Sequence, residues 1–381
     1  MTYKYNPIPI FYYHSIAPER DNRWCNSFLT FKARYLEDLL CYLRRRRYHF
    51  ISLDEYFELR RDPTAGRKRI ICLTFDDGYL DNYIYLYPLL SRYKARGTIF
   101  VSPLFIEERE DLRTGHRKSG FASWNELLHM QQSGVIDIES HTMTHTRYTA
   151  SGKLTGFHHP GARPIYTIVN RYPEKAPYYP GDNTFFQLIP YGTPLFEEGS
   201  AVVTRRVAIN EDFEKECVEA LSGYDWSNYD FNDCLARVEH ILGRYRSDGN
   251  LVMNTESDEA YRKRLHYEIA GSKELIEQKL GKPVNHICWP HGDYNELCHK
   301  LAREAGYHSS NIVLLPGELN HYDDRFDRTG SGAVANSRLF TLLKARYKIG
   351  LYRKDFPWYQ IGKAYSTLKY GKKKSITGNS M

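Results

Sequence analysis

The feature that most constrains the fold is a regular alternation of short apolar segments with segments of helical spacing. The apolar runs, which are typical of buried β-strands, lie at residues 8–13, 70–75, 98–102, 135–139 and 286–289. Between them, apolar side chains recur three or four positions apart, and this spacing predicts helices at residues 32–47, 124–132 and 262–280. Strands that alternate with helices favour parallel βαβ units, so we expect an α/β sheet or barrel.

The alternation is interrupted between residues 147 and 260. Seven of the 17 prolines fall within residues 160–194, and a more helical stretch follows at residues 212–246. We therefore expect a barrel whose first part is 1–146 and whose second part is 261–340, separated by an insertion or sub-domain at 147–260. Residues 341–381 would form a basic, aromatic tail. The insertion directly follows two histidines, His141 and His145, which are candidate active-site residues. We therefore expect the insertion to shape or cap the active site.

The composition excludes a disordered or membrane-spanning chain. Hydrophobic residues make up 41% of the sequence and charged residues 26%, and no apolar run approaches the roughly 18 residues of a transmembrane helix. The first residues lack the continuous apolar stretch of a secretory signal, and the seven cysteines form no C-x-x-C pair. We expect free, buried thiols and a cytoplasmic location.

Positive charge is concentrated in the tail. Residues 341–381 contain ten lysines and arginines and a single aspartate, a charge of +9 against a chain total of +7, which leaves −2 for residues 1–340. Nucleic acid is therefore not an expected partner. A basic segment with interleaved aromatic residues suits peripheral contact with an anionic membrane, at the inner membrane face for a cytoplasmic protein. The alternative is a solvated extension that packs a few aromatic rings onto the domain.

Two short motifs follow predicted strands. The strand at residues 70–75 runs into Asp76-Asp77-Gly78, and the strand at 135–139 is followed by His141-Thr-Met-Thr-His145. In parallel α/β folds the residues just after the strands line the active-site face. Two histidines four positions apart and a carboxylate form an open ligand set that suits Zn²⁺ or another divalent metal in hydrolysis.

These motifs resemble those of the polysaccharide deacetylase family, also called the NodB homology or carbohydrate esterase family 4 group. The family motif T-F-D-D-G is intact at 74–78, and the motif H-[ST]-x-x-H is intact at 141–145. The similarity covers roughly residues 8–146 and 260–310. It implies a distorted parallel (β/α) barrel of NodB type, here with a large insertion and a basic C-terminal extension.

The resemblance also implies an activity and a set of roles. The chain would be a metal-dependent N-deacetylase of an acetamido sugar, in a glycan or a glycan precursor. Asp77, His141 and His145 would bind the divalent metal, with Zn²⁺ expected, and Asp76 would be the general base for attack by metal-bound water. A backbone N–H near Pro290–His291 would hold the developing oxyanion.

Two elements of the family pattern differ in this sequence. The third motif reads C-W-P-H-G-D at 288–293, without the arginine that many members carry, and either Arg328 or Arg338 is available to replace it. The late Leu-x-x-His motif of the general acid is not recognisable. Candidates for the acid are His291, which we place first, His14 and His321. Trp289, Tyr294 and Trp124 are equally compatible with an apolar wall for a sugar ring and with core packing. The residues predicted to bind substrate are His14, Trp289, Pro290 and Tyr294.

Two other functions remain open on the sequence. The same fold could remove a formyl or other acyl group from an amine, or it could be a catalytically silent glycan-binding member.

Overall fold

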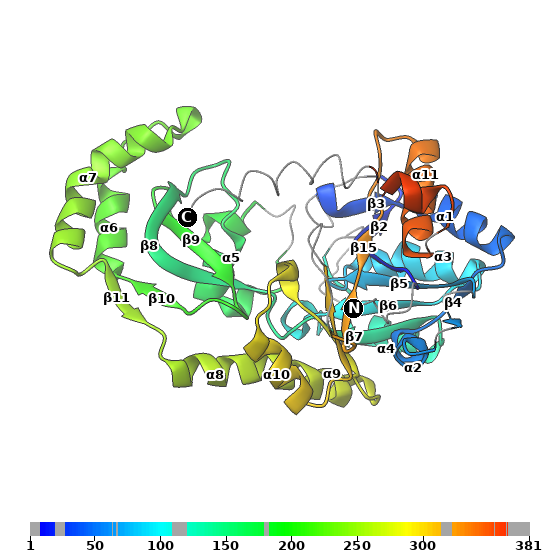
Figure 1. Ribbon diagram of the computed structural model, residues 1–381. Helices are drawn as coiled ribbons and strands as arrows, with labels where there is room; N and C mark the ends of the chain where they lie inside the picture. The colour runs from blue at the N-terminus through cyan, green and yellow to red at the C-terminus, as the bar shows by residue number, and fades with distance from the viewer. Residues whose placement is uncertain are drawn as a thin grey trace, which may run out of the picture.

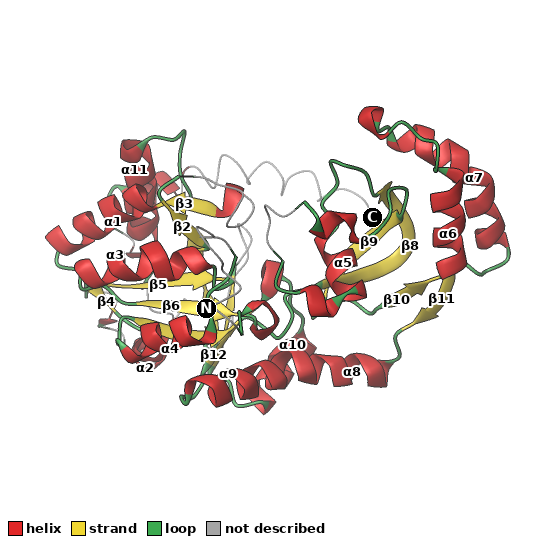
Figure 2. Ribbon diagram, turned by 180° about the vertical axis from the view of Figure 1, so that it is seen from behind, coloured by secondary structure: helices red, strands yellow, loops and turns green. Residues whose placement is uncertain are grey.

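The structure is a computed structural model, which describes residues 8–19, 27–62, 64–65, 68–108, 120–178, 183–313, 322–353, 355–362 and 364. It consists of two lobes that lie side by side (Figure 1). One lobe is a strand-rich barrel with helices around it, and the other is built from the insertion. Figure 2 shows the same arrangement from behind, with the continuous helical series of residues 258–280 running beneath both lobes.

The barrel is built from parallel strands. The central sheet has the order β14-β13-β12-β7-β6-β5-β1-β15, with β4 paired to β5 outside this path, and every pairing in it is parallel. The strands are β1 (Ile10–Tyr13), β4 (His49–Phe50), β5 (Ile70–Asp76), β6 (Gly97–Val101), β7 (Ile136–Ser140), β12 (His286–Cys288), β13 (Ser309–Ile312), β14 (Arg325–Asp327) and β15 (Thr329–Gly330).

One short segment joins the two edges of this sheet. β14 pairs with β13, whereas β15, which begins two residues after β14 ends, pairs with β1 at the opposite edge. Between them, the backbone N–H of Arg328 donates to the carbonyl of Ile312 at 2.9 Å. The sheet therefore curves into a nearly closed barrel, which confirms the predicted fold class.

Helices cover the outside of the barrel. Around it lie α1 (Ala33–Arg45), α2 (Leu53–Leu59), α3 (Tyr87–Arg92), α4 (Trp124–Gln132), α9 (Ser272–Leu280), α10 (Glu296–Glu304) and α11 (Arg338–Arg353). Except for α2, their apolar faces pack on strand residues in one core, where Leu36 and Leu40 of α1 and Leu127 of α4 are fully buried; α2 packs into a separate cluster. A parallel pair of short strands, β2 (Ser15–Ala17) and β3 (Thr30–Lys32), lies outside the main sheet. No described helix has the length and apolar character required to cross a bilayer.

The insertion forms a second lobe with its own core. It contains the antiparallel pair β8 (Arg147–Phe157) and β9 (Pro194–Ser200), the pair β10 (Val207–Ile209) and β11 (Val252–Thr255), and the helices α5 (Ile165–Arg171), α6 (Glu211–Ala220) and α7 (Phe231–Ser247). A buried cluster that includes Phe157, Phe213 and Val238 lies between the helices and the β8–β9 sheet. The helical stretch expected at 212–246 is thus two helices.

The predicted helix at 262–280 is also more complex than its spacing indicated. α8 (Asp258–His266), a π-helical turn (Tyr267–Gly271) and α9 follow one another without a break. The series ends at Gly281, whose φ of 66° is left-handed, as the sequence predicted. π-Helical turns often lie at functional sites, and this one places a buried carboxylate, Glu268, toward the histidine motif.

Candidate active site and metal centre

The site begins where β5 ends. All seven residues of β5 are buried, and the chain then turns at Asp77 and Gly78, whose φ angles are 75° and 71°. A Cβ at position 78 would lie 2.9 Å from Cγ1 of Val101 in the neighbouring strand β6, so only glycine fits this turn. The turn sets the two adjacent carboxylates in different surroundings.

The histidine motif follows β7 and is held from behind by the π-helical turn. Both Thr142 and His145 have positive φ, at 64° and 47°. The side chain of Glu268 accepts hydrogen bonds from the backbone N–H of Thr144 at 3.0 Å and from its hydroxyl at 2.6 Å. Strained backbone persists only where surrounding contacts determine it, so Glu268 fixes the loop that carries both histidines. The sequence motifs gave no indication of this role.

The structure brings the three predicted metal ligands together. Oδ1 of Asp77 lies 3.5 Å from Nε2 of His141 and 3.3 Å from Nε2 of His145. One donor atom from each of the three residues lies within 4.8 Å of the others. Oδ1 of Asp77 is buried and has no hydrogen-bond partner among the described residues. A buried, unpartnered carboxylate oxygen that faces two imidazole nitrogens fits a divalent cation.

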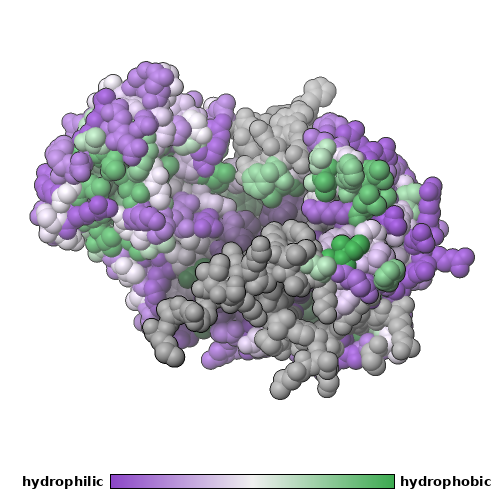
Figure 3. All heavy atoms as spheres, turned by 45° about the horizontal axis from the view of Figure 1, so that its top comes forward, coloured by the Kyte–Doolittle hydropathy of each residue, from purple (hydrophilic) through white to green (hydrophobic). Residues whose placement is uncertain are grey.

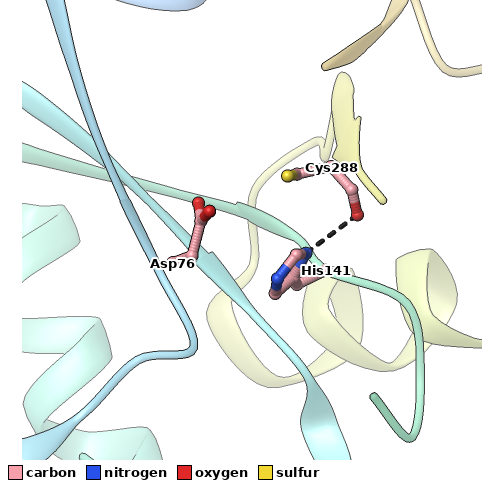
Figure 4. Close-up of side chains that lie close together, drawn as sticks. All are labelled: Asp76, His141 and Cys288. Carbon is pink, nitrogen blue, oxygen red and sulfur yellow. Dashed lines mark hydrogen bonds between the residues drawn. The ribbon is translucent and has the colours of Figure 1, made fainter. Parts of the chain in front are cut away.

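The orientation of His141 agrees with this assignment. Its Nδ1 lies 2.9 Å from the backbone carbonyl of Cys288 and donates to it, so Nε2 is free to act as a ligand (Figure 4). The side chain of His145 is neutral at physiological pH because burial lowers its pKa to about 4, against the opposing effect of Asp77. Neutral imidazole is the metal-binding form.

A second possible ligand group, Asp76, His141 and Cys288, also lies within 4.8 Å. In this group the thiol of Cys288 and both carboxylate oxygens of Asp76 already accept hydrogen bonds from Arg328. The donor atoms of the Asp77 group are therefore the ones available to a cation.

Asp76 and Arg328 form a buried, bidentate salt bridge, the Asp76–Arg328 fork. Nη1 and Nη2 of Arg328 lie 2.7 and 2.9 Å from Oδ1 and Oδ2 of Asp76, and both residues are at most 4% exposed. Burial alone would raise the pKa of Asp76, but the guanidinium outweighs it and holds the pKa below its ordinary value. Of the two arginines left open by the sequence, Arg328 thus lies in the site. Arg338 instead pairs with Asp38 on the surface.

Two of the three candidate acids, His14 and His291, lie on different sides of the predicted metal centre. Nε2 of His14 lies 3.8 Å from Oδ2 of Asp76. The ring of His291 lies edge-on to that of His145, with centroids 4.6 Å apart, and burial lowers the pKa of His291 to about 2. His291 also has a positive φ of 61°. His321 lies outside the described residues.

These groups line a cavity of about 410 Å³ at the carboxyl ends of the barrel strands. Its volume is in the range of small-molecule sites. Figure 3 shows the molecule hollowed between its lobes. Aromatic rings line much of the cavity, and they come from both lobes: Tyr12, Phe28, Tyr79, Phe105, Phe121, Tyr166, Tyr178 and Trp289.

Of the four predicted substrate-binding residues, two line the cavity and two do not. His14 and Trp289 line the cavity, and Pro290, which is buried, lies between Trp289 and His291 in the chain. Neither Pro290 nor Tyr294 is among the residues that line the cavity; the ring of Tyr294 packs on His299 of α10 at 4.8 Å, and contact of these two residues with substrate stays a prediction. Trp124 is 8% exposed in the barrel core, beneath Lys279.

The chain was compared with known proteins. Residues 64–156 and 246–310 match the family profile described as polysaccharide deacetylase. YxkH of Bacillus subtilis (strain 168), which is named for this family, is 29% identical over 138 residues, or 36% of this chain and 43% of YxkH. The poly-β-1,6-N-acetyl-D-glucosamine N-deacetylase of Escherichia coli (strain K12) is 22% identical over 149 residues, or 38% of this chain and 22% of that protein. The matched region thus spans less than half the length of either curated relative.

The fold agrees with these matches. A solved structure of a de-N-acetylase from Aggregatibacter actinomycetemcomitans superposes with a TM-score of 0.50 and 16% identity, covering 84% of this chain and 93% of that one. The intact T-F-D-D-G and H-[ST]-x-x-H motifs and the two matched segments agree: over these segments the chain is similar to the polysaccharide deacetylase family, and the barrel agrees with that similarity.

Proposed function

We propose that the protein is a metal-dependent N-deacetylase that hydrolyses the acetamido group of an N-acetylated sugar, in a glycan or a glycan precursor. The observation that carries the proposal is the unpartnered Oδ1 of Asp77, which faces Nε2 of both His141 and His145 beside the Asp76–Arg328 fork. The name of the E. coli relative, an N-deacetylase of poly-β-1,6-N-acetyl-D-glucosamine, supports an acetamido sugar as the substrate.

Asp77, His141 and His145 would hold the cation, and the two-nitrogen, one-oxygen set suits Zn²⁺. A divalent cation bound there supplies a Lewis acid that polarises the amide carbonyl and acidifies water. Asp76 takes the proton from the attacking water. Arg328 prepares it for this role, because the fork fixes the carboxylate plane and keeps the group charged.

The departing amine must then receive a proton. His14 lies near the groups between which this proton must move, since its Nε2 is 3.8 Å from Oδ2 of Asp76, which accepts the proton from water. His291, the residue placed first on the sequence, lies on the His145 side of the cavity. We propose His14 as the proton donor and His291 as a residue that bounds the substrate cavity.

The test joins metal content with acetate release. The full chain and its Asp77→Ala and Asp76→Asn variants are purified, and bound metal and acetate from N-acetylglucosamine oligomers are measured. We expect about one metal per wild-type chain, loss of metal and acetate release in Asp77→Ala, and retained metal without acetate release in Asp76→Asn. Metal with no acetate would indicate another acyl amide as substrate, and no metal would favour a silent glycan-binding protein.

We also propose that residues 341–381 contact an anionic membrane surface from the cytoplasm. In support, two large apolar side chains of this segment, Phe356 and Ile361, are exposed beyond the end of α11, and Leu339 and Phe340 are exposed just before the segment begins. Lysines and arginines accompany them in the sequence. Sedimentation with phosphatidylglycerol vesicles, compared with phosphatidylcholine vesicles, tests this. We expect binding to the anionic vesicles that Phe356→Ser weakens, whereas a protein that stays in the supernatant with both would contradict it.

A further inference from the structure

The insertion contributes side chains to the cavity. Tyr166 and Tyr178 line it together with the metal-ligand residues and Asp76. Both tyrosines fall between the two segments that match the family profile, 64–156 and 246–310. The metal-ligand residues and Asp76 therefore lie within the segments that match the family, whereas part of the cavity wall comes from residues outside the match.

Contacts on both sides hold this wall in place. The ring of Tyr178 packs edge-on against Phe105 and Phe121 of the barrel, at centroid distances of 5.8 and 6.2 Å. It also packs on Phe185 of the insertion at 5.7 Å, with the two rings tilted by 30°. At the end of α5, the side chain of Asn170 accepts a hydrogen bond from the hydroxyl of Thr146, one residue after the histidine motif, at 2.9 Å. The insertion is thus tied to the site by aromatic packing and by a hydrogen bond.

Tyr166 lies directly beside the catalytic groups. It belongs to the first turn of α5, and its hydroxyl lies 3.5 Å from Nε2 of His291. The two rings meet edge-on with centroids 5.7 Å apart, and His291 in turn meets His145. The half-buried ring of Tyr166 therefore bounds the cavity within one residue of a predicted metal ligand.

The charge of the cavity restricts what it can bind. Among the described residues that line it, Arg328 is the only arginine or lysine, and both of its Nη atoms are engaged by Thr74, Asp76 and Cys288. Away from the predicted metal site, a phosphate or carboxylate would find no available lysine or arginine among these lining residues. Aromatic rings offer instead a flat apolar surface.

We propose that Tyr166 is a specificity-determining residue, whose ring forms the wall against which a neutral sugar ring bearing the acetamide is placed. This inference rests on the proposed N-deacetylase function and deepens it: the substrate unit that contacts Tyr166 is an uncharged pyranose. Tyr166 contacts the sugar and does not take part in proton transfer.

The experiment compares Tyr166→Ala and Tyr166→Phe with Tyr191→Ala. Tyr191 is a matched control, because it is a tyrosine of the same insertion, 39% exposed, that does not line the cavity. Acetate release is measured on N-acetylglucosamine oligomers and on N-methylacetamide, which has the amide but no ring. Calorimetry in the Asp76→Asn background measures oligomer binding without turnover.

For Tyr166→Ala we expect KM for the oligomer to rise roughly tenfold and oligomer binding to weaken by a similar factor, as expected for loss of one aromatic contact. Metal content and turnover of N-methylacetamide should be unchanged. Tyr166→Phe should retain most of the affinity, and Tyr191→Ala should match the wild type.

Unchanged oligomer binding in Tyr166→Ala would overturn the inference. An equal loss on the oligomer and on N-methylacetamide would also overturn it, because that result assigns Tyr166 to the reaction itself. A wild type that binds the oligomer through Tyr166 but releases no acetate would contradict the proposed function alone, since the calorimetric result would still support the wall.

Discussion

Asp76 and Asp77 are adjacent in the chain, yet they face different partners. Oδ1 of Asp77 faces two imidazole nitrogens, whereas both oxygens of Asp76 face one guanidinium. Like charges so close would ordinarily raise the pKa of one carboxyl group. Here each carboxylate has its own source of positive charge or its own site for a cation, so both can remain ionised and perform separate tasks.

This arrangement predicts the effect of Arg328→Gln. Without the guanidinium, burial raises the pKa of Asp76, so the base is protonated at a higher pH and the acidic limb of the kcat/KM profile moves upward. We expect kcat to fall by on the order of 100-fold, since a misplaced general base loses most of its contribution. The measurement is a pH–rate profile, with thermal unfolding as a check on folding.

Arg338→Gln is the control for this variant, because Arg338 also pairs with an aspartate but on the surface. Its profile should overlay that of the wild type. An unshifted acidic limb in a folded Arg328→Gln protein would contradict the role given to the fork.

The choice between the two histidines is also testable. If His14 delivers the proton to the amine, His14→Ala should lower kcat at least 100-fold with the metal content unchanged. His291→Ala should affect KM more than kcat, because its ring bounds the cavity. Steady-state kinetics with metal analysis separates the two, and the reverse pattern would restore His291 as the acid.

At the scale of elements, the π-helical turn Tyr267–Gly271 holds the histidine loop through Glu268. We expect Glu268→Ala to weaken metal affinity roughly 10- to 100-fold, as is typical of groups that orient metal ligands. Glu274→Ala, on the exposed side of the following helix α9, serves as the control. Metal titration of the two variants measures the effect, and equal affinities would show that the loop holds its shape without Glu268.

The segment that closes the barrel gives a prediction on stability. Phe326 of β14 is 3% exposed and packs on Tyr56 of α2 with ring centroids 4.6 Å apart. Truncating a buried phenylalanine costs about 3–5 kcal/mol, so Phe326→Ala should lower the free energy of unfolding by that amount. Urea unfolding measures it, and a loss below about 1 kcal/mol would mean that β14 contributes little to closure.

The same elements show what a sequence can predict. Strands β5 and β6 are buried throughout and β7 at all but one residue, and the motifs lie at the ends of β5 and β7, so local pattern was sufficient to place Asp76, Asp77, His141 and His145. Arg328 could not be selected on sequence, because it lies between a three-residue and a two-residue strand that have no readable periodicity. Proximity to the third motif in the sequence did not reveal the contact of Tyr294, whose ring packs on His299.

At the scale of the whole molecule, the segments that match the family profile and the insertion contribute differently. The matched segments supply the metal-ligand residues, Asp76 and the central strands β5, β6, β7 and β12, and their resemblance to known deacetylases made the fold predictable. The insertion was predicted as an interruption near the site, but Tyr166 and Tyr178 were not identified. They reach the cavity through the packing of two lobes, which no local motif in a proline-rich segment encodes.

The central claim is that Asp77, His141 and His145 hold a divalent cation that the reaction requires. The most direct test is the metal content of the purified wild type and of Asp77→Ala, measured on the same samples as acetate release from N-acetylglucosamine oligomers. The account predicts about one metal ion per wild-type chain and, in the variant, loss of both the metal and the acetate. Full acetate release by a variant without metal would contradict it.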